Sequence, residues 1–188
     1  MAMSPYLRDL RAKVGNELLL LPAVSVFVVD EAARQVLLCR NAGQTQWEAI
    51  GGMVEPHEHP LTAAQRELQE EAGLLVGLED LVLLGSVGGP EYLVTYPNGH
   101  QVSYVTTAYR VTGVSRDSVV ADGVEVTALG WHHLADLTGL INSSDTNDST
   151  KTSRASNASD ADAVAAKPDP DLYGLFVRSL LAEFGGLL

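Results

Sequence analysis

The chain has 188 residues, of which 24 are acidic and 12 are basic, so its formal net charge is −12 at pH 7. This excess of negative charge argues against a nucleic-acid backbone or an anionic membrane as the main partner. It does not argue against a small nucleotide, because bound divalent cations can reverse the charge locally. The length and an apolar fraction of 46% predict one domain with a full hydrophobic core and room for an appendage.

The N-terminus and the cysteine content favour a cytoplasmic protein that does not enter a membrane. Charged side chains are scattered through residues 8–17, which is unlike a secretory signal peptide. The longest apolar run, residues 18–29, is interrupted by Pro22 and is shorter than the roughly 20 residues that span a bilayer. Cys39 is the single cysteine, so no intrachain disulfide can form, and we interpret it as a small buried residue.

Two strands are predicted first along the chain. Residues 22–30 are rich in β-branched side chains, which favours a strand buried on both faces. Residues 31–34 then form a turn, and residues 34–40 are expected to pair back as the second arm of a hairpin. A loop that ends at Trp47 follows, before a pair of glycines at positions 51 and 52.

A helix is predicted over residues 60–72, and both of its ends carry signals. Pro60 suits the first helical turn, and Gly73 suits the residue after the last turn. The apolar side chains fall on one stripe at helical spacing: Leu61, Ala64, Leu68 and Ala72. Three glutamates are expected to crowd into one patch off this buried stripe: Glu67, Glu70 and Glu71. Like charges at this spacing cost an isolated helix roughly 0.2–0.5 kcal/mol per pair, so a partner should offset the repulsion unless water screens it.

The remaining strands follow this helix. Residues 78–89 predict one strand, and residues 92–113 predict a hairpin whose turn is the Pro-Asn-Gly of residues 97–99, because Asn-Gly is the strongest short hairpin signal. Residues 126–134 predict a last strand that runs into a short helix. Strands on both sides of one central helix predict an α+β fold, in which helices cover a mixed sheet.

The composition changes after residue 141, which we take as the end of the main domain, residues 1–141. Of the 25 residues 142–166, 16 are Ser, Thr, Asn or Asp. Such a segment cannot bury enough apolar surface to offset its ordering entropy, so we predict a flexible insertion or linker over residues 142–167. Residues 168–188 regain helical periodicity. We expect them to form a C-terminal helix that packs on the domain or on the partner subunit of a homodimer.

One motif carries more information than the composition. Within residues 51–74 the chain matches the glycine, glutamate, arginine and apolar positions of the Nudix box without a gap: Gly52, Glu58, Arg66, Glu67, Leu68, Glu70, Glu71, Gly73 and Leu74. The chain therefore resembles the Nudix hydrolase family (MutT-like), closely over these 23 residues and more loosely over residues 20–140. The resemblance implies a Nudix-like α/β/α sandwich with a mixed sheet, in which a strand leads into a catalytic loop–helix–loop.

The resemblance also implies a metal-dependent pyrophosphohydrolase that acts on a small nucleotide. Mg²⁺ is the implied ion, with Mn²⁺ able to substitute, because hard cations of this kind take carboxylate oxygens and water as ligands. The implied ligands are the three glutamates of the helix and the carbonyl of Gly51, with Glu58 as a structural or secondary metal contact. Arg66 is implied as the residue that orients the carboxylates. One of the three glutamates, or Glu125 on a later loop, is implied as the general base.

Four assignments stay open at the level of the sequence. Glu125 is equally well explained as an exposed loop acid, and Asp122 competes for its role. Trp47 could stack on the base of a substrate, but packing against the sheet would explain it as well. Arg40 could bind a substrate phosphate, and a surface ion pair is the equal alternative.

The chain departs from the family pattern at two positions near the glycine pair. Ile50 stands where the family commonly has proline, and His57 stands where it commonly has glycine. If this loop position requires a positive φ, His57 is strained or the loop is reshaped. Neither departure alters an implied ligand.

The substrate is not identified by the motif. In relatives, a proline after the box hints at ADP-ribose and a tyrosine slightly further on hints at diadenosine polyphosphates, and this chain has both Pro90 and Tyr92. We favour a nucleoside diphosphate linked to another moiety, of the ADP-ribose or nucleotide-sugar type. A nucleoside triphosphate pyrophosphohydrolase is the second alternative, and a non-catalytic nucleotide-sensing module is the third.

Overall fold

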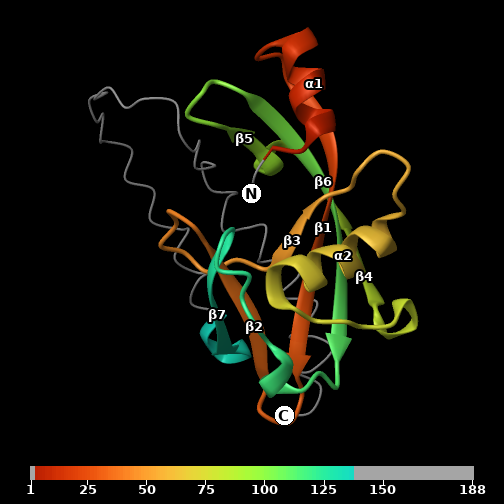
Figure 1. The fold of residues 1–188 in the computed structure, drawn as a ribbon, viewed down its shortest axis with the longest axis vertical. Coiled ribbons are helices and arrows are strands. Elements are labelled where there is room, and N and C mark those ends of the chain that lie inside the picture. Colours follow the sequence, from red (N-terminus) through yellow and green to blue (C-terminus); the bar gives the residue numbers. More distant parts are fainter. Residues whose placement is uncertain (1–2, 138–188) are drawn as a thin grey trace.

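The computed structural model describes residues 3–137, in which helix α2 packs on a seven-stranded mixed sheet (Figure 1). The helices and strands are α1 (Pro5–Val14), β1 (Leu19–Asp30), β2 (Gln35–Asn41), β3 (Ile50–Met53), α2 (Pro60–Ala72), β4 (Val82–Val87), β5 (Leu93–Thr95), β6 (Gln101–Thr112) and β7 (Val126–His133). Short 3-10 turns occupy Leu78–Asp80, Pro90–Tyr92 and Arg116–Ser118. No helix in residues 3–137 is long and apolar enough to cross a bilayer. The predicted insertion (142–167) and the predicted C-terminal helix (168–188) lie outside the described residues.

The sheet is arranged around β1. On one edge β1 runs parallel to β6, from Leu19 opposite Val102 to Val29 opposite Thr112. On its other edge it pairs antiparallel with β3 and then with β2. The strand order is β4-β6-β1-β2-β7, with β5 added to β6. This arrangement is the mixed sheet that the sequence predicts.

The centre of β1 is buried on both faces, as its β-branched composition predicts. Val26 and Val28 pack in the cluster that includes Leu68 of α2. Phe27 and Val29 belong to a second cluster, on the opposite face of the sheet. All four strand side chains are at most 2% exposed. The strand therefore fixes two apolar layers at once, and α2 covers one of them.

Helix α2 has the ends that the sequence predicts. After its last residue, Gly73 takes the left-handed conformation, with a φ of 68°, that closes a helix C-terminus. At the N-terminus the capping residue is His59, whose Nδ1 accepts a hydrogen bond from the backbone N–H of Leu61 at 3.3 Å. The predicted apolar stripe faces the sheet, and three of its members are fully buried: Ala64, Leu68 and Ala72.

The prediction of one strand over residues 78–89 is wrong at its start. Residues 78–80 form a 3-10 turn, in which Asp80 accepts a hydrogen bond from the backbone N–H of Gly77 at 3.1 Å. This local carboxylate bond competes with strand pairing, so β4 begins only at Val82. The turn predicted at residues 97–99 is confirmed, although its first arm, β5, has only three residues.

The sequence analysis did not identify the N-terminal helix α1. Its N-cap is Ser4, whose hydroxyl oxygen accepts from the backbone N–H of Leu7 at 3.2 Å. Arg11 is buried and donates to three backbone carbonyl oxygens, those of Gly15 (3.1 Å), Glu17 (2.7 Å) and Gln101 (2.7 Å). These bonds hold the end of α1 against the start of β6, where Figure 1 places it.

Candidate active site

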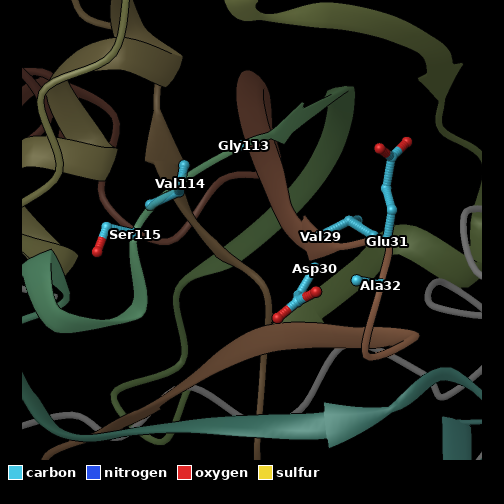
Figure 2. A pocket seen from close by; sticks show the side chains of 7 residues that line it. All are labelled: Val29, Asp30, Glu31, Ala32, Gly113, Val114 and Ser115. Carbon is cyan, nitrogen blue, oxygen red and sulfur yellow. The ribbon is translucent and has the colours of Figure 1, made fainter.

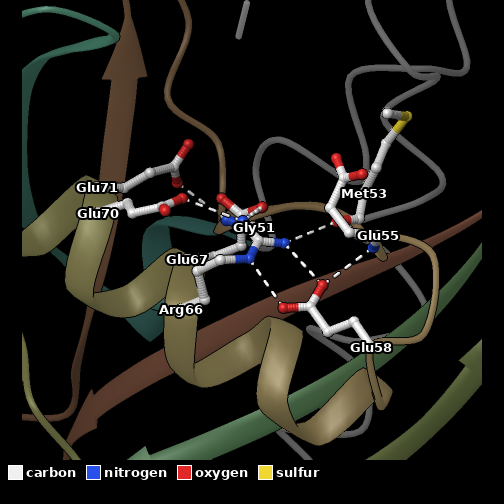
Figure 3. A network of polar contacts seen from close by, with 8 residues as sticks. All are labelled: Gly51, Met53, Glu55, Glu58, Arg66, Glu67, Glu70 and Glu71. Atoms are coloured by element: carbon white, nitrogen blue, oxygen red, sulfur yellow. Dashed lines mark hydrogen bonds and ion pairs between the residues drawn. The ribbon is translucent and has the colours of Figure 1, made fainter. Parts of the chain in front are cut away.

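Strand β3 brings a glycine backbone within reach of α2. Gly51 pairs with Ser25 of β1, and its φ of 155° is one that side-chain-bearing residues rarely adopt. A Cβ at this position would stand 2.1 Å from the carbonyl oxygen of Val24, so only glycine fits. From here the N–H of Gly51 donates to Oε2 of Glu71 at 3.0 Å (Figure 3). Gly51 therefore joins β3 of the sheet to α2 through the carboxylate of Glu71.

Two of the three helix glutamates are buried, which corrects the expectation that all three lie off the buried stripe. Glu67 is 5% exposed and Glu71 is 4% exposed, whereas Glu70 is exposed. The sequence places the carboxylates on a helix face, but it does not show that β3 lies against that face. Only the pairing of β3 with β1 does so.

Burial gives these two carboxyl groups unusual acidity. Burial raises the pKa of Glu71 to about 8, and the nearby charges of Glu67 and Glu125 act in the same direction. The hydrogen bond from Gly51 acts in the opposite direction but does not overcome burial. The pKa of Glu67 is also raised, again chiefly by burial, although Arg66 opposes the shift. Both groups would become easier to ionise beside a cation.

Arg66 is the partner that offsets repulsion among the glutamates. Its Nε and Nη2 donate to the two carboxylate oxygens of Glu58, at 2.9 and 3.0 Å, in a bidentate pair. Its Nη1 donates to Oε1 of Glu67 at 2.7 Å and to Oε2 of Glu70 at 3.0 Å. Figure 3 shows the guanidinium between the loop and the helix, where Nη2 also donates to the carbonyl of Met53 at 3.0 Å.

Glu58 belongs to this network rather than standing apart from it. Besides the bidentate pair, its Oε2 accepts from the backbone N–H of Glu55 at 3.0 Å. The hydrogen bond from Arg66 is the largest of the effects that lower the pKa of Glu58. Both oxygens of this carboxylate therefore accept hydrogen bonds, from Arg66 of α2 and from the loop backbone, which fits the structural alternative for Glu58 better than a metal contact.

The donor set fits a hard divalent cation. The carboxylate oxygens of Glu67 and Glu70 converge on one positively charged nitrogen of Arg66, within 2.7 and 3.0 Å. Beside them, the surroundings of buried Glu71 raise its pKa and so favour its neutral form, whereas added positive charge would favour ionisation. Among residues 3–137 no three such side chains already stand close enough together to hold an ion. A cation would therefore draw these oxygens together in competition with Arg66.

The structure separates the two loop acids that compete for a catalytic role. Val126, the residue after Glu125, is buried in the cluster that also holds Leu68 and Ala72 of α2, so the loop of Glu125 reaches this helix. The charge of Glu125 contributes to the raised pKa of both Glu67 and Glu71. The carboxylate of Asp122 instead accepts three backbone N–H groups of its own loop. Burial opposes it, but these bonds lower the pKa of Asp122. Sequence reasoning names both residues and cannot separate them, because both lie in one short loop.

Arg40 and Trp47 lie together at the end of β2 and in the loop that follows. The guanidinium carbon of Arg40 is 5.0 Å from the centre of the Trp47 ring, a cation–π distance. The other neighbour of this ring is His132, at 4.6 Å between ring centres. Trp47 also packs over Gly130, where an added Cβ would stand 3.0 Å from the indole. Packing on the sheet thus accounts for the position of Trp47, and its ring stays half-exposed.

The segment that carries Arg40 and Trp47 is joined to the loop of Glu125 by a backbone hydrogen bond. Ala42, directly after β2, donates its N–H to the carbonyl oxygen of Glu125 at 2.8 Å. The loop that carries Glu125 therefore contacts the segment that carries Arg40 and Trp47. The sequence alone does not place His132 beside Trp47, although strand alternation puts Gly130 and His132 on one face of β7.

The loop of the box has the strain that its sequence suggests. His57 has a φ of 67°, in the left-handed region that glycine prefers. The loop therefore keeps the backbone shape of a glycine at this position and carries a histidine in it. The strain comes from the Cβ of His57 at this φ. The residue itself is exposed to solvent.

A shallow pocket lies away from the carboxylates. It is lined by Val29, Asp30, Glu31, Ala32, Gly113, Val114 and Ser115 (Figure 2). These residues belong to the β1–β2 turn and to the chain after β6, whereas β3 and Gly51 pair with the first half of β1. None of them is a predicted site residue, so the pocket does not coincide with the acidic cluster.

Comparison with protein families gives a match across most of the chain. The family model described as the NUDIX domain matches residues 19–152. An RNA pyrophosphohydrolase of Halorhodospira halophila is 43% identical over 65 residues, which are 35% of this chain and 34% of that protein. The chain therefore matches about a third of the length of this curated relative.

Solved structures share the fold at low sequence identity. An Ap4A hydrolase from C. elegans, solved as a binary complex, is 17% identical with a TM-score of 0.50, and the match covers 88% of this chain and 98% of that one. A MutT/nudix family protein from Enterococcus faecalis is 23% identical with a TM-score of 0.49, over 69% of this chain and 51% of that one. Together with the family match, the likeness to the C. elegans protein confirms the predicted α+β fold class.

Proposed function

The chain belongs to the Nudix family, and on that basis we propose that it is a pyrophosphohydrolase of nucleotide substrates. The observation that carries the proposal is the buried carboxylate pair. Glu67 and Glu71 lie under a glycine backbone, beside the Arg66 network, at the positions of an intact box. Two buried, closely spaced carboxyl groups with raised pKa values destabilise a fold, so a binding role explains them better than a structural one.

The family generally uses divalent metal ions, and we propose Mg²⁺ here, with Mn²⁺ able to substitute. Glu67, Glu70 and Glu71 would hold the ion, with the carbonyl of Gly51 as a further ligand. Bound there, the ion would neutralise the pyrophosphate and polarise the phosphorus under attack. We assign Glu58 to positioning Arg66, since both of its oxygens accept hydrogen bonds from that guanidinium.

In the proposed reaction a water oxygen attacks phosphorus and the bridging P–O bond breaks, so that the bridging oxygen leaves with the second product. One proton of the water must pass to a base. A carboxylate of the acidic cluster would accept it, either one of the three helix glutamates or Glu125. In the protein without an ion, Arg66 donates to Glu67 and Glu70 and so orients both carboxylates.

The substrate we favour is a nucleoside diphosphate linked to another moiety, of the ADP-ribose or nucleotide-sugar type. We propose that Trp47 stacks on the base and that Arg40 binds a phosphate, because the two lie together and contact the loop of Glu125. The net charge of −12 favours a small nucleotide over a long polyanion. A MutT-like hydrolysis of nucleoside triphosphates is the second candidate, and a nucleotide-sensing module without activity is the third.

We further propose a cytoplasmic location, and a homodimer as an alternative to a monomer.

The test is turnover on a substrate panel. It would contain ADP-ribose, nucleotide sugars, diadenosine polyphosphates, nucleoside triphosphates and, since a relative carries that name, RNA with a 5′-triphosphate. Each would be assayed with Mg²⁺, with Mn²⁺ and with EDTA. We expect one class to be cleaved, and cleavage to stop in EDTA.

A matched pair of variants identifies the site. Glu70→Gln should lower turnover at least 100-fold without unfolding the protein, because Glu70 is exposed and its loss leaves the core intact. Glu79→Gln, an exposed glutamate outside the box, should leave turnover unchanged. Unchanged turnover in Glu70→Gln would contradict the metal assignment. A folded wild-type protein that binds nucleotide but cleaves none would favour the sensing module.

A further inference from the structure

The loop between β6 and β7 is fastened to the end of α2. The backbone N–H of Val120 donates to the carbonyl oxygen of Ala72, the last residue of the helix, at 2.9 Å. The next residue, Gly73, lies under this loop, and a Cβ added there would stand 3.3 Å from the carbonyl oxygen of Val120. The loop is therefore anchored to the same helix that carries the glutamates.

Within this loop, one carboxylate collects the backbone donors. Oδ1 of Asp122 accepts from the N–H groups of Val124 (3.1 Å) and Val126 (2.8 Å), and Oδ2 accepts from that of Glu125 (3.1 Å). Asp122 itself is exposed, so it is not a member of the core. Three such bonds from one side chain fix the turn that leads into β7.

Glu125 is the residue that this turn immobilises. Its N–H donates to Asp122, and its carbonyl oxygen accepts from the N–H of Ala42, at 2.8 Å. Both polar groups of its backbone are thus bonded, one to the turn and one to the end of β2. The next residue, Val126, is buried in the cluster that holds Leu68 and Ala72, so the turn sets Glu125 next to the helix that carries the glutamates.

We propose that Asp122 is a positioning residue for the hydrolytic site: by gathering three backbone N–H groups it holds Glu125 against the buried carboxylates of α2. The inference rests on the proposed function, because it gives Glu125 a catalytic role and gives Asp122 a role through Glu125 only. Catalytic groups must be held within a fraction of an ångström, so a loosened turn should lower turnover while the fold persists.

The first test compares three variants under conditions in which each is folded. Asp122→Ala should lower kcat about 10- to 100-fold with little change in KM, since small misplacements of a catalytic group have effects of this size. Asp122→Asn keeps one acceptor oxygen and should fall between wild type and Asp122→Ala. Asp30→Ala is the matched control, because Asp30 also accepts a backbone N–H in a turn, that of Ala33 at 2.9 Å, beside the distant pocket. Its kcat should equal that of the wild type.

A double variant separates positioning from general loosening. If Asp122 acts through Glu125, Asp122→Ala should add less than twofold to the loss of kcat in a Glu125→Gln background. Losses that multiply would overturn the proposal, as would a wild-type kcat in Asp122→Ala when Glu125→Gln alone is impaired. A Glu125→Gln variant with wild-type kcat would overturn it as well.

Amide hydrogen exchange tests the same contact without any substrate. Asp122→Ala should speed exchange of the Ala42 N–H, whose acceptor is the carbonyl of Glu125, at least tenfold, and the Asp30→Ala control should leave it unchanged. Unchanged protection of Ala42 in Asp122→Ala would overturn the proposal even if the protein cleaves its substrate. Absence of turnover in the wild type would count against the proposed function, and the exchange result would still decide whether Asp122 holds the turn.

Discussion

His57 holds a backbone conformation that the other residues of the loop do not require. Its φ of 67° places a Cβ where glycine would have none, at a cost of roughly 1–2 kcal/mol for a residue in the left-handed region. Replacing it with glycine removes this strain and adds some chain entropy to the unfolded state, which offsets part of the gain. His57→Gly should therefore raise the free energy of unfolding by roughly 0.5–1 kcal/mol.

Thermal unfolding measures this effect directly. For a protein of this size the gain corresponds to about 1–4 °C in Tm. His57→Ala is the control, because alanine keeps the Cβ and should give no increase. An equal increase in both variants would mean that the imidazole, and not the backbone, is the source of strain.

A second prediction at this scale concerns Glu71 and pH. Its pKa in the folded protein is about 8, against an ordinary value of 4.5, so the folded state holds the proton more tightly than the unfolded state. The stability that this preference provides is fully present below the ordinary pKa, and it is lost as the pH rises toward the folded value. In protein free of divalent cations, Tm should fall as the pH rises from about 4.5 to about 8. Glu67, whose pKa is also raised by burial, acts in the same direction.

Calorimetry in EDTA across this pH range would measure the slope. Glu71→Gln still offers an oxygen to the Gly51 N–H but cannot ionise, so its Tm should depend less on pH. Adding Mg²⁺ at the upper end of the range should recover part of the lost stability, since a cation favours the ionised carboxylates. Equal slopes in the wild type and the variant would contradict the assignment to Glu71.

At the scale of elements, Arg66 joins the loop of the box to α2. Arg66→Lys keeps one positive charge but cannot give two parallel N–H bonds to Glu58. The side chain is 29% exposed, so solvent screens part of the loss, and we expect roughly 1–2 kcal/mol lower stability by urea unfolding. Arg8→Lys, at an exposed arginine of α1 with one long bond to a carbonyl, should change stability by less than about 0.5 kcal/mol. A loss in Arg66→Lys no larger than in the control would contradict the structural weight given to this network.

The sequence predicts a helix or strand well where residues that start and end it are present at both of its ends. Pro60 and Gly73 bracket α2, and the helix begins and ends where they indicate. Residues 78–80 were misassigned, because a side-chain bond from Asp80 outweighs the apolar pattern. Helix α1 was missed because charged residues interrupt its apolar side chains. It is held by Leu7, which packs with Leu21 and Val102, and by the bonds of Arg11 to backbone carbonyls.

The residues of the site could be predicted from the sequence, but the burial of their side chains could not. The spacing of the box names the glutamates and Arg66, but the burial of Glu67 and Glu71 depends on β3, which lies against α2 only through its pairing with β1. The role of Asp122 depends on three hydrogen bonds inside one turn, which leave no periodic trace in the sequence. Such features appear only when distant segments are brought together.

At the scale of the whole molecule, the parallel pairing of β1 with β6 sets the order in which the protein can be completed. Leu19 of β1 pairs with Val102 of β6, which lies far along the chain. The ribosome therefore releases β1 long before its neighbour is made. Until then one edge of this apolar strand has no partner, and contacts so far apart in sequence form slowly. The box is fully synthesised by Leu74, yet β1 lacks its parallel neighbour until Thr112 has emerged, and the sheet is complete only after His133. The nascent chain therefore spends that interval with one edge of an apolar strand unpaired, and such an edge can pair with another chain.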